Sequence, residues 1–183
     1  MSRFAALLIS VPLISLILAL PVNGQSEGIP FHVDDPTSTT ANPPLRKFLP
    51  SANPYARRLL TDKFIFVNDI QKVDHDVLRI FYAKVPARDI ANRGQRFNPT
   101  DVEVGAHLPS RRFVLSGSCP TMCFILYEVG GIGYHHNLIV FSRNKKWSLV
   151  AAVTGFLKDN SFESLKQSVS AGKFVDQPGY PQY

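Results

Sequence analysis

Two cysteines are the residues whose type and spacing most directly suggest chemistry. Cys119 and Cys123 are the only cysteines in the chain, and three residues separate them. Pro120 presets the backbone for a tight bend, and such a bend could bring the two Cα atoms within disulfide reach. We therefore predict a Cys119–Cys123 disulfide that stabilises the fold by about 2 kcal/mol. Its ring would hold Pro120, Thr121 and Met122 rigid for a protein partner, because a preordered loop loses less entropy on binding.

Other chemistry fits the cysteine pair less well. Redox-active cysteines are typically separated by two residues, and a zinc site needs a second pair of ligands that this sequence does not show. The sequence also has no nucleophile elbow, no phosphate-binding glycine loop and no HExxH motif. We expect neither a metal nor a cofactor.

A carboxylate and a histidine form the second candidate site. If residues 130–133 connect two antiparallel strands, Glu128 lies opposite His135, with their Cβ atoms within about 5.5 Å. Asn137 would lie on the same face as His135. The pair could act in acid–base catalysis or help to bind a metal, or it could be a plain cross-strand ion pair. The segment Asp74–Asp76, which we expect to be extended, is a weaker metal candidate.

A disulfide-bracketed loop on an exported α+β sheet resembles the bacterial inhibitors of vertebrate-type lysozyme. The resemblance covers only the Cys119–Cys123 region. In that family the loop carries a histidine that enters the lysozyme cleft, whereas the ring here holds Pro120, Thr121 and Met122 and is one residue shorter. The resemblance is one of architecture, and it assigns no residue of this chain a role.

The elements that position these residues form a predicted β-meander. Apolar runs separated by short polar or glycine-rich connections indicate strands at 112–115, 122–129, 134–142 and 147–154. Residues 63–68 and 77–85 are rich in aromatic and β-branched residues, which favours two more strands, although the second run also fits a helix. Phe162, Leu165 and Val169 form a helical apolar stripe. We predict an α+β fold with an antiparallel sheet of about five or six strands and a C-terminal helix packed on one face.

The ends of the chain have a different composition. Residues 1–24 are typical of a signal peptide cleaved after Gly24, with a transmembrane anchor as the alternative. Residues 25–58 are rich in proline and polar residues, so we expect a disordered leader, in which Arg57-Arg58 could be a dibasic processing site. The predicted globular domain then covers residues 59–175, and 176–183 form a flexible tail.

Charge and export limit the choice of function. The net charge is +6, but the basic residues occur in pairs such as Lys145-Lys146, so we do not expect nucleic-acid binding. These pairs could serve solubility, or they could attract an anionic envelope, a glycan or an acidic partner. We expect a secreted or periplasmic binding module, such as an inhibitor, an immunity-type protein or an envelope-associated factor, with a protein partner outside the cytoplasm. The alternatives are a small hydrolase that uses Glu128 and His135, and a secreted effector.

Overall fold

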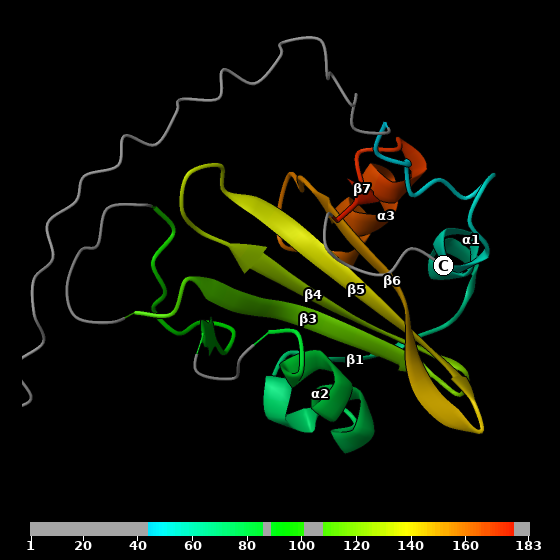
Figure 1. Cartoon of the computed structure of the whole chain (residues 1–183), viewed down its shortest axis with the longest axis horizontal. Helices are drawn as coiled ribbons and strands as arrows, with labels where there is room; N and C mark the ends of the chain where they lie inside the picture. The colour runs from blue at the N-terminus through cyan, green and yellow to red at the C-terminus, as the bar shows by residue number, and fades with distance from the viewer. Residues whose placement is uncertain (1–43, 86–88, 101–107, 178–183) are drawn as a thin grey trace, which may run out of the picture. The chain divides into compact units, whose positions relative to one another are not determined.

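The computed structural model describes residues 44–85, 89–100 and 108–177, which all belong to one compact unit (Figure 1). Its centre is a seven-stranded sheet. The four long strands are β3 (Arg111–Cys119), β4 (Met122–Val129), β5 (His135–Asn144) and β6 (Lys146–Gly155). The short strands are β1 (Ile65–Val67), β2 (Ile90–Ala91) and β7 (Val175–Asp176). The helices are α1 (Pro54–Thr61), the 3-10 helix η1 (Ile70–Lys72), α2 (His75–Tyr82) and α3 (Phe162–Ser170).

The long strands form an antiparallel meander. The order across the sheet is β1-β3-β4-β5-β6-β7, and β2 pairs with β3 in parallel. Register shifts interrupt the β3–β4 pairing between Phe113 and Leu115 and the β5–β6 pairing near Val140. Such bulges change the face to which the following side chains point.

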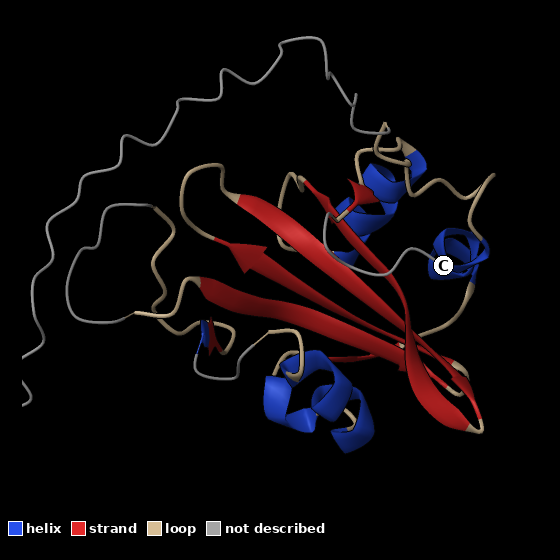
Figure 2. Cartoon of the chain, in the orientation of Figure 1, coloured by secondary structure: helices blue, strands red, loops and turns tan. Residues whose placement is uncertain are grey.

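Helices cover both faces of the sheet (Figure 2). On one face, α1 and α3 contribute Leu59 and Leu165 to a core that includes Phe124. On the other face, α2 contributes Val77 and Phe81 to a second core. Because both faces are buried, seven of the eight residues of β4 are buried and the strand shows no alternation of apolar and polar residues.

The predicted fold class is confirmed: the protein is α+β, with an antiparallel sheet and a C-terminal helix, α3, on one face. The strand predicted at 77–85 is wrong, because residues 75–82 form α2. Asp74 begins this helix by accepting hydrogen bonds from the backbone N–H groups of Asp76 and Val77. The segment Asp74–Asp76 is therefore a helix cap and not an extended metal-binding strand.

The fold begins earlier than the expected boundary at residue 59. Phe48 is buried, and α1 begins at Pro54 behind an Asn53 cap that accepts hydrogen bonds from two backbone N–H groups. Arg57 and Arg58, the expected processing pair, lie in this helix. The predicted signal peptide and the leader up to residue 43 lie outside the described residues. Within the described residues, no helix combines the length and the apolar character that a membrane span requires.

Candidate functional site

The predicted disulfide is wrong: both cysteines are free thiols. Strand β3 runs up to Cys119 and β4 starts at Met122, so Cys119 pairs with Met122 and Ser118 pairs with Cys123. Neighbouring residues of a strand point to opposite faces, and the two thiols therefore lie on opposite sides of the sheet. Cys123 is buried, and burial raises the pKa of its thiol to about 11. Without the disulfide, the resemblance to the lysozyme inhibitors loses its basis.

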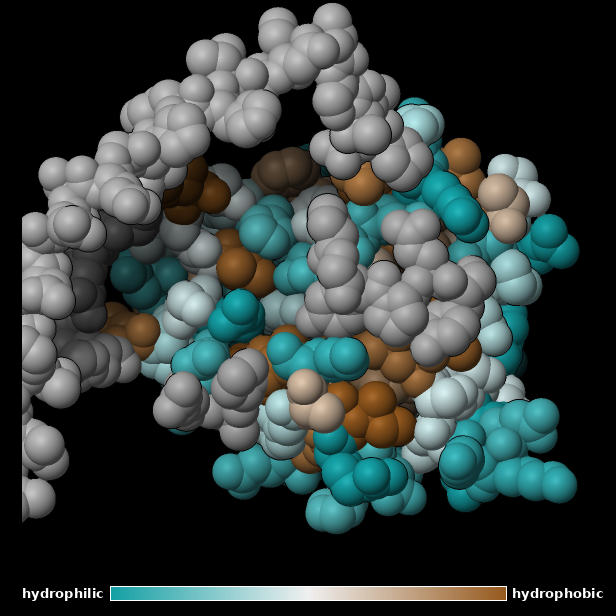
Figure 3. Space-filling view, viewed as in Figure 1, coloured by the Kyte–Doolittle hydropathy of each residue, from teal (hydrophilic) through white to brown (hydrophobic). Residues whose placement is uncertain are grey.

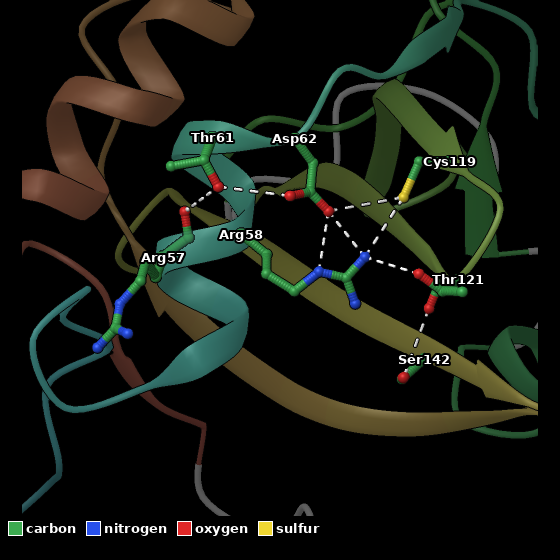
Figure 4. Close-up of polar contacts among 7 residues, drawn as sticks. All are labelled: Arg57, Arg58, Thr61, Asp62, Cys119, Thr121 and Ser142. Atoms are coloured by element: carbon green, nitrogen blue, oxygen red, sulfur yellow. Dashed lines mark hydrogen bonds and ion pairs between the residues drawn. The ribbon is translucent and has the colours of Figure 1, made fainter.

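The turn between β3 and β4 is held by contacts other than a disulfide (Figure 4). Arg58 of α1 donates a hydrogen bond from Nη2 to Thr121 Oγ1 over 2.8 Å and forms an ion pair with Asp62 at 2.7 Å. The Sγ atom of Cys119 lies 3.5 Å from the same nitrogen. Pro120 and Thr121 are exposed, but Met122 is fully buried, so the three residues do not form one presented loop.

The predicted pairing of Glu128 with His135 is also wrong. Tyr134 belongs to the loop and β5 starts at His135, so Val129 pairs with His135 and Glu128 pairs with His136. His135 is bound through Nδ1 to the carbonyl oxygen of Gly133 at 2.7 Å. Asn137 hydrogen-bonds to Tyr127 on the other face, so it is not part of a cluster with Glu128.

Glu128 is the centre of a polar cluster that the sequence did not reveal. Its side chain is 2% exposed and forms an ion pair with Arg112 of β3, with 2.5 Å between Nε and Oε1. Tyr134 donates a hydrogen bond to the other carboxylate oxygen. The guanidinium of Arg112 also lies 4.2 Å from the centre of the Phe97 ring, within the range of a cation–π contact. Both oxygens of Glu128 are therefore occupied.

Tyr134 and the neighbouring His136, which pairs with Glu128, have shifted pKa values. Burial, together with the hydrogen bond to Glu128, raises the pKa of Tyr134, so its hydroxyl keeps its proton and remains a donor. Burial lowers the pKa of His136, against the opposing effects of Asn160 and Glu128. His136 Nε2 lies 2.8 Å from Asn160 Oδ1, and Nδ1 has no hydrogen-bond partner among the described residues. A neutral imidazole with its proton on Nε2 can donate to Asn160 Oδ1, and its Nδ1 lone pair then has no donor among the described residues.

A pocket of about 610 Å³ opens next to Arg112, Glu128 and Tyr134. Its other wall is the segment 96–100, which packs against the loop between β4 and β5. Gly130 allows this approach, because a Cβ atom there would lie 1.9 Å from the carbonyl oxygen of Asn98. The N–H group of Gly130 donates to the carbonyl oxygen of Ser110 at 2.8 Å, which fixes the loop. The glycine-rich connection therefore serves the pocket as well as the hairpin turn.

The lining of the pocket combines cations, hydrogen-bond donors and apolar groups. Arg96, Arg112, Asn98 and Tyr134 line the pocket together with the apolar residues Phe97, Pro99 and Leu108. Its volume lies within the range of small-molecule sites, about 300–1,000 Å³. Because Arg112 and Glu128 neutralise each other, Arg96 leaves the lining with a positive charge. The pocket can therefore hold an anionic group next to an apolar one.

The chain was compared with protein-family models, curated proteins and solved structures. None matches. Within the described part of the chain, no three His, Cys, Asp or Glu side chains are grouped closely enough to hold a metal ion. The function is therefore inferred from the geometry of this pocket.

Proposed function

We propose that the protein is an exported binding protein whose pocket takes a small ligand, or the end of a peptide, with an anionic group next to an apolar one. One observation carries this proposal: Arg112 is held at the pocket by Glu128 and Phe97, while its terminal nitrogens have no hydrogen-bond acceptor among the described residues. A planar guanidinium held in this way suits the two oxygens of a carboxylate or a phosphate. Export is supported by the composition of residues 1–24.

The mode of binding follows from what holds Arg112. Its Nε is bound to a buried carboxylate, so the side chain loses little conformational freedom when an anion pairs with its outer edge. Arg96 is exposed and supplies the second cation. The Tyr134 hydroxyl gives its one proton to Glu128, so towards a ligand it can act only as an acceptor. Phe97, Pro99 and Leu108 would contact the apolar part of the ligand.

The hydrolase hypothesis receives less support from this geometry. A general base needs a free lone pair within reach of a substrate proton, and both oxygens of Glu128 already accept hydrogen bonds from protein groups. His135 does not face Glu128. The effector hypothesis has no observation in its favour.

Ligand binding can be tested with simple probes. Thermal unfolding would be followed with benzoate, hexanoate and phenyl phosphate, and with benzylamine as a cationic probe of similar size. A ligand that binds the native state alone raises the melting temperature in a concentration-dependent way, so we expect stabilisation by at least one anion and none by benzylamine.

The variants for this test separate charge from folding. Arg96→Met should reduce the stabilisation, because it removes the positive charge of the lining that no carboxylate neutralises. Arg96 is exposed, so the substitution should leave the fold intact. Arg111→Met removes the neighbouring cation, which pairs with Asp89 outside the pocket, and should leave the stabilisation unchanged. Equal responses of the two variants, or equal stabilisation by benzylamine, would reject the anion pocket.

A further inference from the structure

The tip of the hairpin between β5 and β6 concentrates positive charge at the end of the sheet opposite the pocket. Arg143, Lys145 and Lys146 are all exposed there, and no ion pair joins them to a carboxylate within the described part of the chain. The hairpin projects beyond the rest of the sheet, and its end forms a hydrophilic projection on the surface (Figures 1 and 3). The tip is therefore a compact cationic protrusion.

The neighbouring elements add to this charge. Arg58 is bound to the turn between β3 and β4 (Figure 4), and Lys63 precedes Ile65, which pairs with Ser118 near the same end of β3. The carboxylates nearby are Asp62, paired with Arg58, and Asp74, which caps α2 and acts electrostatically on Cys123. A third carboxylate, Asp76, lies two residues further on in the first turn of α2. Five cations against these three carboxylates give this end, here called the basic end, a charge of +2. Its cations are Arg58, Lys63, Arg143, Lys145 and Lys146.

Contacts with the neighbouring turn hold the hairpin tip in position. The carbonyl oxygen of Thr121 accepts hydrogen bonds from the backbone N–H of Arg143 at 3.0 Å and from Ser142 Oγ at 3.4 Å. The guanidinium of Arg143 lies 5.6 Å from the centre of the Trp147 ring. Because the tip is tied to the sheet, the backbone that carries these cations keeps a fixed position and loses little entropy on binding a surface.

An apolar side chain is exposed beside one of these cations. Ile65 is 76% exposed on the edge strand β1, two residues after Lys63, and pairs with Ser118 near the end of β3. The next residue, Phe66, points to the other face and packs against Phe162. An exposed aliphatic side chain next to a lysine suits the boundary between lipid headgroups and acyl chains. A nucleic-acid groove would instead offer a series of aromatic platforms along a basic track.

We propose that the basic end binds the surface of a membrane that contains anionic phospholipids. Lys145, Lys146 and Arg143 would contact the headgroups, with Ile65 at the boundary. Each lysine or arginine near such a surface strengthens binding about fivefold, and this contribution falls with rising salt. The proposal is independent of the ligand pocket, because the two sites share no residue and lie at opposite ends of the sheet.

The sole tryptophan of the chain provides the readout, because Trp147 lies at the hairpin. The protein, purified in the form that cells produce, would be titrated with vesicles of phosphatidylcholine alone and of phosphatidylcholine mixed with phosphatidylglycerol. Sedimentation measures binding, and the Trp147 emission reports the environment of the hairpin. We expect a salt-sensitive component of binding that occurs only with the mixed vesicles and shifts the emission to shorter wavelength.

Matched variants test which cations are responsible. Lys145→Asn with Lys146→Gln should weaken binding to mixed vesicles about 25-fold, from about fivefold per charge. Asparagine is chosen because residue 145 has a φ of 66°. Lys158→Gln with Lys173→Gln removes the same charge from loops outside the basic end and should change binding less than about twofold, as expected for distant, screened charges.

Three results would overturn the assignment. The hairpin variant could bind mixed vesicles as tightly as the unmodified protein. Phosphatidylcholine alone could bind equally well with the same emission shift, which would assign the binding to apolar contacts. A single-stranded oligonucleotide could bind more tightly than the mixed vesicles and compete with them, which would assign the basic end to nucleic acid.

Discussion

Replacing Arg112 with methionine should expose how much the buried Glu128 depends on it. Arg112→Met leaves a carboxylate that is 2% exposed with only the Tyr134 hydroxyl as partner. Breaking a buried ion pair from one side costs about 3–5 kcal/mol, because the remaining charge is buried and unpaired. The Arg112 side chain is 30% exposed, so water can partly replace it, and we expect a loss near the lower limit, about 3 kcal/mol.

The measurement is urea unfolding of the variant beside the unmodified protein. With a denaturant slope of about 2 kcal/mol per M, a loss of 3 kcal/mol lowers the midpoint by roughly 1.5 M. Arg112→Met combined with Glu128→Met removes both charges, and should be much more stable than Arg112→Met alone because no unpaired carboxylate remains.

Arg111 provides a control in the adjacent position. Its side chain is 31% exposed, which is nearly the same as for Arg112, but its partner Asp89 is 39% exposed and 3.9 Å away. Pairs of this kind contribute about 0–1 kcal/mol, so Arg111→Met should shift the midpoint by less than roughly 0.5 M. If both arginine variants lose the same free energy of unfolding, the burial of Glu128 is not what makes Arg112 important.

Three further predictions address the cysteines, the pocket wall and His136. Without reductant, the folded protein should react with a thiol reagent at Cys119 alone, and at both cysteines once unfolded, since Cys123 is 1% exposed; absence of free thiols after unfolding would contradict this. Gly130→Ala should weaken ligand binding, measured by the probe-induced thermal shift, because its Cβ atom would displace Asn98; an unchanged shift would mean that this wall is not needed. Because the pKa of His136 is lowered in the native state, the unfolded chain takes up a proton at a higher pH than the native protein does as the pH falls below 6.5. The neutral His136 therefore contributes its full stabilisation above that pH, and this contribution is lost as the pH falls further. Urea unfolding at several pH values on both sides of this pH gives the change of the unfolding free energy with pH. This change should be smaller for His136→Gln than for the unmodified protein, with the exposed His75→Gln as control; the same change in all three proteins would refute the assignment.

The sheet could be predicted because its signals are local. Glycine-rich and basic polar connections separate four long apolar runs, and each run became a long strand. The stripe of Phe162, Leu165 and Val169 predicted α3 for the same reason. The helix α2 was missed because a short apolar run fits both periods, although the Asp74 cap two residues before Asp76 was a readable signal for a helix.

The first helix was missed because composition outweighed capping. Its surroundings are rich in proline and polar residues, which is typical of a disordered segment. Asn53 followed by Pro54 is nevertheless a strong start signal, since asparagine caps the first N–H groups and proline suits the first turn. Ala56 and Leu59 then lie on one side of a short helix and are fully buried.

The site was harder to predict because it depends on one-residue differences in register. Starting β5 at His135 instead of Tyr134 changes the partner of Glu128 from His135 to His136. The irregularity between Phe113 and Leu115 places Arg112 opposite Glu128, on the same face as Leu115. Strict alternation along the strand would have placed Arg112 on the opposite face from Leu115. Extending β3 to Cys119 separates the two thiols in the same way. The types of residue in the sequence drew attention to both ends of the sheet at which function is proposed. Which side chains meet at each end depends on the pairing of the strands.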